Sequence, residues 1–150
     1  MTDMPMELTV KRFNELTVPE LYAILRARCD VFVVEQKCAY ADIDGVDPRA
    51  LHMYIWENGA VIAYLRVFEK EDEPGTLQIG RVLTIRRGEG LGKALLRGSL
   101  GYILSELRPK RLFLEAQCYA TGFYEREGFR ICGEPFDEDG IPHVAMELIP

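Results

Sequence analysis

A run of glycines and cations at residues 86–96 places the tightest constraint on how this chain can fold. The run, RRGEGLGKALL, follows a segment rich in branched residues at 76–85 and passes directly into a leucine-rich segment. Branched residues favour a strand, and apolar residues spaced by three and four favour a helix. We therefore predict a strand that ends in a glycine turn and opens a helix.

Such a junction is a general anion site, because the first N–H groups of a helix lack partners and the helix dipole adds partial positive charge. Two common nucleotide motifs do not fit the spacing. A P-loop would need glycine at Arg87 and a hydroxyl at Ala94, and a dinucleotide fingerprint would need glycine at Lys93. The pattern that fits is R-x-x-G-x-G, beginning at Arg87.

Charge supports an anion site at this junction. Residues 81–97 hold five cations and one carboxylate, a local charge of +4 in a chain whose net charge is -6. The overall negative charge argues against nucleic acid or an anionic membrane as a partner, so an anionic ligand must be met locally. The other interpretation is that the glycines only shape a turn and the arginines form a solvated face.

Capping and turn residues predict the order of the other elements. Thr17 and Glu20 fit a capping box with Pro19 in the first turn, and Asn58–Gly59 is typical of a two-residue hairpin. We predict strands at 8–13, 52–57, 60–68, 76–85, 111–117 and 143–149, helices from Thr17, from the glycines to Pro109 and over 121–128, a long acidic loop at 38–50 and a turn at 136–142. This order indicates an α+β sheet in one domain, 1–150, with its core at about 8–149.

Cysteine spacing argues against a zinc-binding protein, and hydropathy argues against a secreted or membrane-spanning one. Four cysteines, Cys29, Cys38, Cys118 and Cys132, are widely spaced and form no zinc motif, so we expect reduced, mostly packing cysteines and no metal. The N-terminus lacks the apolar run of a signal peptide, and no segment approaches a membrane span. We expect a cytoplasmic protein without membrane partners.

Two separated motifs resemble the GNAT (Gcn5-related) N-acetyltransferase superfamily. The first is RVLTI with RRGEGLGKAL, and the second, ATGFYEREGF, matches the pattern A-x-x-F-Y-x-x-x-G-F after the strand LFLEAQ. The segments RCDVFVVEQKCAYADIDGVD and DEDGIPHVAM further resemble the ElaA-like branch. The resemblance implies the GNAT fold, a central mixed, mostly antiparallel sheet of about six or seven strands with helices on both faces.

The resemblance also implies an activity. An acetyl-CoA-dependent N-acetyltransferase moves an acetyl group to a primary amine, of a small molecule or a peptide, by direct attack on the thioester. The alternative is a non-catalytic acyl-CoA-binding regulatory module that uses the same pocket. A two-fold homodimer is the commonest assembly of small enzymes, and the oligomeric state stays open.

Site residues follow from the resemblance position by position. It assigns the backbone of Val82, Leu83 and Thr84 to the pantetheine arm, with an N–H near Val82 or Leu83 for the oxyanion. It assigns main-chain N–H groups to the pyrophosphate from Arg87, Gly88, Glu89, Gly90, Leu91, Gly92 and Lys93. Gln117 stands in place of a cofactor-binding asparagine, and Tyr124 matches the tyrosine thought to protonate the leaving thiolate. The stretch before this loop is shorter than usual in the family, which implies a tighter turn.

The sequence does not identify which residue is the base that takes a proton from the substrate ammonium. Glu35 follows the apolar run VFVV, where partial burial would raise its pKa, although a structural carboxylate is the other interpretation. His143 and His52 are possible proton relays or structural residues. Cys118 is interpreted as packing. The acidic loop at 42–47 departs from a calcium loop, and either attracts a cationic substrate or is merely solvated.

Overall fold

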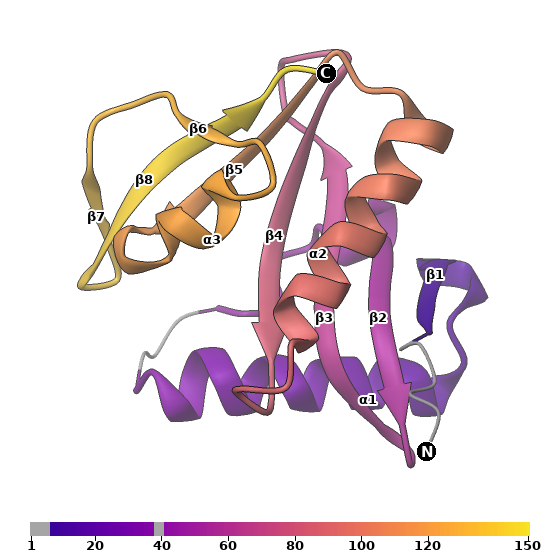
Figure 1. The fold of residues 1–150 in the computed structure, drawn as a ribbon. Helices are drawn as coiled ribbons and strands as arrows, with labels where there is room; N and C mark the ends of the chain where they lie inside the picture. Colours follow the sequence, from indigo (N-terminus) through magenta and orange to yellow (C-terminus); the bar gives the residue numbers. More distant parts are fainter. Residues whose placement is uncertain (1–6, 38–40) are drawn as a thin grey trace.

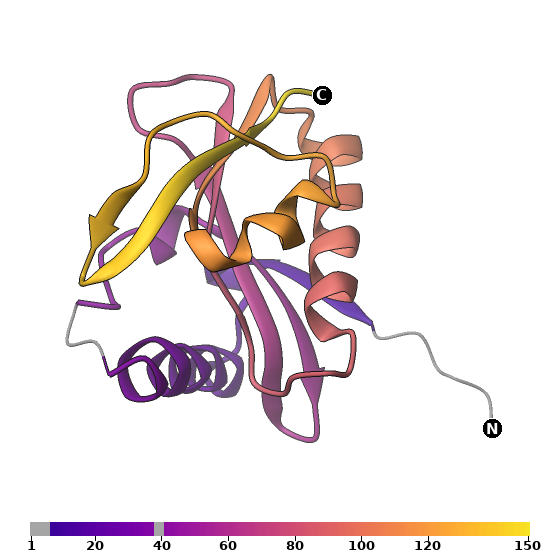
Figure 2. The ribbon, with the colours of Figure 1, turned by 60° about the vertical axis from the view of Figure 1, so that its left-hand side comes forward.

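Eight strands form one mixed sheet with a helix on each face (Figure 1). The computed structural model describes residues 7–37 and 41–150. The strands follow the order β1-β2-β3-β4-β5-β8-β6, and β7 pairs with β8. Neighbouring strands are antiparallel except β4 and β5, which run parallel. Figure 2 shows α1 and α2 on opposite sides of the sheet.

The bounds of the elements are as follows. The strands are β1 (Leu8–Arg12), β2 (Leu51–Glu57), β3 (Ala60–Glu69), β4 (Thr76–Thr84), β5 (Arg111–Gln117), β6 (Arg130–Ile131), β7 (Phe136–Glu138) and β8 (Ile141–Leu148). The α-helices are α1 (Val18–Arg28), α2 (Leu91–Tyr102) and α3 (Thr121–Glu125). The short helical segments are η1 (Phe13–Glu15), η2 (Cys29–Glu35), η3 (Asp47–Arg49), η4 (Ile103–Leu107) and η5 (Cys118–Ala120).

The predicted capping box starts α1. The Glu20 N–H donates to Thr17 Oγ1 at 3.2 Å, and the Thr17 N–H donates to Glu20 Oε1 at 2.8 Å. These reciprocal bonds satisfy two N–H groups that a helix start would otherwise leave without partners. The helix continues into η2, a π-type segment that carries the chain to the edge of the site.

The predicted hairpin joins β2 and β3. Asn58 and Gly59 have φ values of 49° and 78°, the pair of positive values that a tight hairpin turn needs. The register then places Tyr54 opposite Tyr64. Both tyrosines are fully buried and face α1.

Two apolar clusters cover the two faces of the sheet. The larger lies between the sheet and α2, where Leu95, Leu96 and Ile103 are fully buried. The smaller includes Ile24 of α1 and lies on the other face. Burial of each such side chain contributes about 1.5–3 kcal/mol. The predicted apolar face of α2 is thus confirmed, except that Leu107 is exposed because η4 widens the helix there.

The C-terminal region contains more strand than the sequence predicts. Residues 136–142, expected to be a turn, form β7 and the start of β8 around a tight turn at Asp139–Gly140, both with positive φ. The two-residue β6 pairs with the other end of β8. These two short strands raise the total to eight, and the α+β class is confirmed.

The cysteine prediction is partly wrong. Cys29 and Cys132 are free and exposed, and Cys118 is half-buried. Cys29 follows the inward-facing Ala27 and Arg28 of α1, so the helical period turns it toward solvent. Cys38 lies outside the described residues. Within the described ranges, no helix combines the length and the apolar character needed to cross a membrane.

Candidate active site

A gap opens between the parallel strands β4 and β5. Their register runs only from Thr76–Arg111 to Ile79–Leu114. Beyond these pairs the two strands diverge, as Figure 1 shows. Backbone N–H and C=O groups that face the gap have no neighbouring strand to pair with, so they are available to a ligand that lies between the strands.

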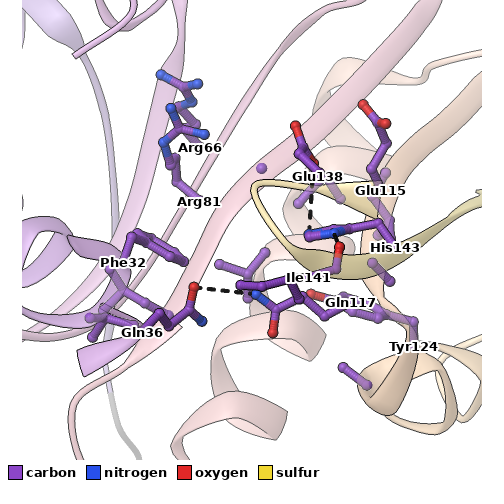
Figure 3. Close-up of a pocket in the computed structure, with 18 of the residues that line it drawn as sticks. Phe32, Gln36, Arg66, Arg81, Glu115, Gln117, Tyr124, Glu138, Ile141 and His143 are labelled. Carbon is purple, nitrogen blue, oxygen red and sulfur yellow. Dashed lines mark hydrogen bonds and ion pairs between the residues drawn. The ribbon is translucent and has the colours of Figure 1, made fainter. Parts of the chain in front are cut away.

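A cavity of about 650 Å³ occupies this gap. Its walls are Gly80–Thr84 of β4, Leu114–Gln117 of β5, part of η2, and the turn between β7 and β8. Figure 3 shows side chains from these four elements converging on one space. The cavity therefore joins segments that are distant in sequence.

A bulge shapes the β4 wall of this cavity. Opposite the single residue Leu65 of β3, β4 supplies both Arg81 and Val82. Arg81 takes the left-handed conformation with φ 52°, which is uncommon for a residue with a side chain. The extra residue reverses the alternation of side chains, so Val82 packs with Ile79 on the α2 side while Leu83 packs on the α1 side.

The acidic loop after η2 holds the bulge in place. Arg81 donates to Asp42 Oδ1 at 3.0 Å and to the Asp42 carbonyl at 3.1 Å. Arg28, which is fully buried, also donates to Asp42, at 3.0 Å, and to Asp47 at 2.7 Å. Arg66 donates to Asp47 at 2.9 Å. Three guanidinium groups thus fix this loop against α1, β3 and β4.

These contacts also lower the pKa values of two carboxyl groups in the loop, Asp44 and Asp47. Burial raises the pKa of Asp47, but Arg28 and Arg66 outweigh it and hold the pKa below its usual value. The hydrogen bond from Arg66 likewise lowers the pKa of Asp44. The carboxylates of the loop are therefore ionised, and arginines of α1, β3 and β4 neutralise their charge. His52 is structural, since its Nδ1 lies 2.6 Å from Tyr64 Oη in a fully buried position.

The glycine turn leaves the start of α2 open. Gly88 and Gly90 have φ values of 76° and 71°, and no atom lies within 4 Å of a Cβ built on either. Gly90 is the N-cap of α2 and supplies no side chain to bond the first N–H groups. Those N–H groups are free to hold an anion. Gly92 packs closely, because a Cβ there would lie 3.4 Å from the Phe123 ring.

The cations around this turn are paired with carboxylates. Arg86 bonds Glu57 and Arg97 bonds Glu127, each at 3.0 Å. Arg81 is held by the acidic loop. Lys93 alone among the five cations has no ion pair with the residues that the structure describes. The predicted excess of +4 is therefore largely neutralised by partners that are distant in sequence.

Two side-chain bridges cross the cavity from η2 and the residue after it. Arg87 donates to Glu35 Oε1 at 2.8 Å, and Gln117 Nε2 lies 3.4 Å from Gln36 Oε1. Figure 3 shows the Gln36–Gln117 contact spanning the space. The Glu35 side chain is 52% exposed, so the expected partial burial is wrong. Val31 and Phe32 pack against the smaller apolar cluster, but Val34 is exposed, and Glu35 likewise points outward, where it meets Arg87.

Tyr124 presents an unpaired hydroxyl to the cavity. The residue is 8% exposed and its ring packs edge-on against Phe123 and Phe129. Its Oη has no hydrogen-bond partner among the described residues, although it lines the cavity. Burial, and to a smaller extent Tyr119, raises the pKa of Tyr124. The phenol is therefore protonated at neutral pH and can donate a proton.

His143 lies across the sheet from Gln117, its partner in the β5–β8 register. Its Nδ1 is 2.7 Å from the Ile141 carbonyl, which can only accept, so Nδ1 carries the proton in the neutral ring. Nε2 is then the basic nitrogen, and it lies 3.7 Å from Glu138. The ring stacks on Phe136. His143 thus has a fixed orientation and a free lone pair beside the cavity.

Glu115 is a cavity residue that the sequence interpretation missed. It lies on β5 two residues before Gln117 and lines the same cavity. Strand alternation puts positions two apart on one face, so the choice of Gln117 as a site residue also indicated Glu115. Burial raises the pKa of Glu115, and the neighbouring carboxylate of Glu138 raises it further.

The comparisons with known proteins agree with this geometry. The chain matches the family model of the acetyltransferase (GNAT) domain over residues 20–150. It is 40% identical to protein ElaA of Escherichia coli over 137 residues, 89% of this chain and 90% of that protein. It is also 40% identical to a UPF0039 protein of Schizosaccharomyces pombe, over 95% and 97% of the two chains.

Solved structures give the same result. The crystal structure of Escherichia coli ElaA superposes with a TM-score of 0.88 at 38% identity, covering 95% of this chain and 98% of that chain. An acyl-CoA N-acyltransferase from Pseudomonas aeruginosa superposes with a TM-score of 0.87 at 37% identity, covering 95% and 99%.

The fold, the gap between β4 and β5 and the family model together define an acyltransferase enzyme whose fold implies a CoA-derived cosubstrate. The chain belongs to the GNAT acetyltransferase family, and within it the chain is ElaA-like.

Proposed function

We propose that this protein transfers an acetyl group from acetyl-CoA to a primary amine by direct attack on the thioester. The observation that carries the proposal is the cavity between β4 and β5, which combines strand backbone with the hydroxyl of Tyr124. The uncapped start of α2 follows shortly after Arg87, a residue that lines this cavity. Acetyl-CoA supplies an acyl group that an amine can attack. Residues of this chain would bind the thioester, protonate the leaving thiolate and take the proton from the amine.

The residues present fit a CoA thioester. The backbone of Val82, Leu83 and Thr84 faces the gap and can pair with an amide-bearing arm as a further strand would. An N–H near Val82 or Leu83, next to the bulge, would stabilise the negative charge that develops on the thioester oxygen. The open turn from Arg87 to Lys93 would hold the pyrophosphate through its N–H groups and two cations.

Tyr124 is the proposed proton donor to the leaving thiolate. Its hydroxyl is unpaired, is packed in place by aromatic neighbours and stays protonated at neutral pH. General acid catalysis of this kind contributes typically about 10²–10⁴-fold in rate. Gln117, beside it on β5, would orient the cofactor arm once its contact with Gln36 opens.

His143 is the favoured base. Its Nε2 lone pair lies beside the cavity and Nδ1–H is fixed on a carbonyl, so the neutral ring can take a proton directly or through one water. Glu35 is less suited, because its carboxylate is engaged with Arg87. Glu35 remains a candidate that the variant described in the Discussion separates from His143.

The alternative is an acyl-CoA-binding module without turnover, and one assay separates the two. Release of CoA thiol from acetyl-CoA is followed over a panel of monoamines, diamines and peptides, for the wild type and for Tyr124→Phe. An enzyme releases thiol only with certain amines, and Tyr124→Phe lowers kcat by at least about tenfold with CoA affinity unchanged. A binder shows CoA affinity without amine-dependent release. Because Oη has no hydrogen-bond partner among residues 7–37 and 41–150, the variant should keep the wild-type melting temperature.

A further inference from the structure

We propose that Glu115 and Glu138 form a subsite for a second cationic group of the acceptor, so that the preferred acceptors are dicationic amines. One amine of such a molecule would be acetylated, and the other would bind as an ammonium between the two carboxylates. This inference rests on the proposed acetyl transfer and names the class of amine used.

The two carboxylates lie at the same end of the cavity. Glu115 comes from β5 and Glu138 from the end of β7, and Figure 3 shows both side chains beside His143. After burial, the charge of Glu138 has the largest effect on the pKa of Glu115, as expected for two like charges at close range. A cation placed between them would relieve this repulsion.

Two other carboxylates that line the cavity already have cations. Asp44 is bound by Arg66 at 2.6 Å, and Glu35 is bound by Arg87 at 2.8 Å. Glu115, in contrast, makes no ion pair or hydrogen bond with any residue in the ranges 7–37 and 41–150. Uncompensated negative charge is therefore concentrated at the β5–β7 end.

Two cationic side chains of the described residues act on Glu115 from a distance, His143 when it is protonated and, more weakly, Lys70. Neither makes an ion pair with Glu115, and the Lys70 Nζ binds Glu73 at 3.3 Å and lies over the Phe113 ring. Glu138 faces His143 Nε2 at 3.7 Å, beyond hydrogen-bonding distance. The subsite thus keeps carboxylate oxygens for a ligand.

Tyr124 independently indicates that a ligand occupies this cavity. It is a polar side chain with 8% exposure, and its hydroxyl lines the cavity without a partner among the described residues. Figure 3 shows it on the side of Gln117, which marks the reacting end. Gln117 is two residues beyond Glu115 on the same face of β5, a separation of about 7 Å. A flexible diamine of five methylene groups is long enough to span that distance.

Steady-state kinetics with two matched acceptors tests the subsite. Diaminopentane and pentylamine have the same chain length and differ by one ammonium group. For the wild type we expect kcat/KM to favour the diamine by about tenfold, the size typical of one charge-assisted hydrogen bond. In Glu115→Gln we expect most of this preference to disappear through a higher KM for the diamine, with pentylamine turnover nearly unchanged. Glu138→Gln should lose the same preference, measured against its own pentylamine turnover, because Glu138 lies 3.7 Å from His143 Nε2 and its removal also affects the base.

Asp137→Asn is the matched control. It removes one negative charge from the same strand as Glu138, but alternation puts its side chain on the other face. The control should keep the wild-type preference. Equal kcat/KM for the two amines in the wild type, or a preference that survives in both Gln variants, overturns the inference.

Direct binding separates failure of this inference from failure of the proposed function. Calorimetry on CoA-saturated protein measures diaminopentane affinity without requiring turnover. If no amine supports thiol release, acetyl transfer is wrong, and the subsite stands only if diaminopentane binds the wild type and not Glu115→Gln. If pentylamine is acetylated but diaminopentane binds no better, the subsite alone is wrong.

Discussion

Arg81 donates hydrogen bonds to both the carboxylate and the carbonyl of Asp42, at 3.0 and 3.1 Å, from the residue that forms the β4 bulge. A residue with φ 52° is held in a conformation that costs about 1–2 kcal/mol for a side-chain-bearing residue. The ion pairs of the acidic loop therefore stabilise the backbone geometry that opens β4 toward the cavity. The loop supports the site instead of forming a free acidic surface.

Asp42→Asn should disturb positioning more than binding. The variant weakens the hold on Arg81, so the bulge N–H groups shift relative to the thioester, and we expect kcat to fall by about 10-fold while the Kd for CoA changes less than about threefold. Arg130→Gln is the control, because it removes an exposed cation far from the cavity and leaves Glu147 paired with Arg111. Unchanged kcat in Asp42→Asn would refute the positioning role.

Glu35→Gln should strengthen CoA binding. Glu35 occupies the guanidinium of Arg87 that the pyrophosphate would use, and an exposed ion pair is worth about 0–1 kcal/mol. Its removal should tighten CoA by up to about fivefold with kcat preserved, as titration and steady-state kinetics would show. A fall in kcat of about 10²-fold or more would instead identify Glu35 as the base.

Gly90→Ala should destabilise the protein and weaken CoA binding. Gly90 has φ 71° at the N-cap of α2, and an alanine in this region costs about 1–2 kcal/mol. Gly101→Ala is the control, with an effect of opposite sign. Gly101 lies within α2 with open space around it, so this substitution should raise the free energy of unfolding by about 0.5–1 kcal/mol. Denaturant unfolding measures both. Equal effects of the two substitutions would contradict the assigned backbone conformation.

Glu20→Gln should destabilise the fold in a pH-dependent way. Burial raises the pKa of Glu20, but hydrogen bonds from Thr17, Lys11 and Tyr54 outweigh it and lower the pKa from 4.5 to about 2. Its stabilising effect is therefore complete above pH 4.5 and is lost as the pH falls toward 2. At pH 7 we expect a loss of about 1–3 kcal/mol in urea unfolding.

The difference between wild type and Glu20→Gln should shrink between pH 4.5 and pH 2. Glu106→Gln, at an exposed position in η4, is the control and should leave the free energy of unfolding at pH 7 nearly unchanged. A constant difference across that range would mean that the Glu20 carboxylate is not stabilised by these partners.

Local signals in the sequence predicted a large part of this structure. The capping box at Thr17, the Asn58–Gly59 turn and the strand–glycine–helix junction each depend on residues that are close in sequence, and all three are confirmed. The motif ATGFYEREGF indicated the family that the comparisons establish.

The parts that could not be predicted depend on contacts distant in sequence. Arg81 and Asp42 are 39 residues apart, so the neutralisation of the basic segment was not visible in a local charge count. The strands β6 and β7 span two and three residues, too few to show alternation. Glu115 was readable from strand alternation, but its closeness to Glu138 requires the β7–β8 turn.

Amide hydrogen exchange in the presence and absence of CoA shows whether the gap between β4 and β5 and the start of α2 form the CoA site. CoA should slow exchange at Val82–Thr84 and Gly88–Lys93 and leave β1 and β2 unaffected. A second cavity, of about 430 Å³, is lined by residues that include Phe13 and Arg49. Protection that falls there instead, or no protection at saturating CoA, would contradict this assignment.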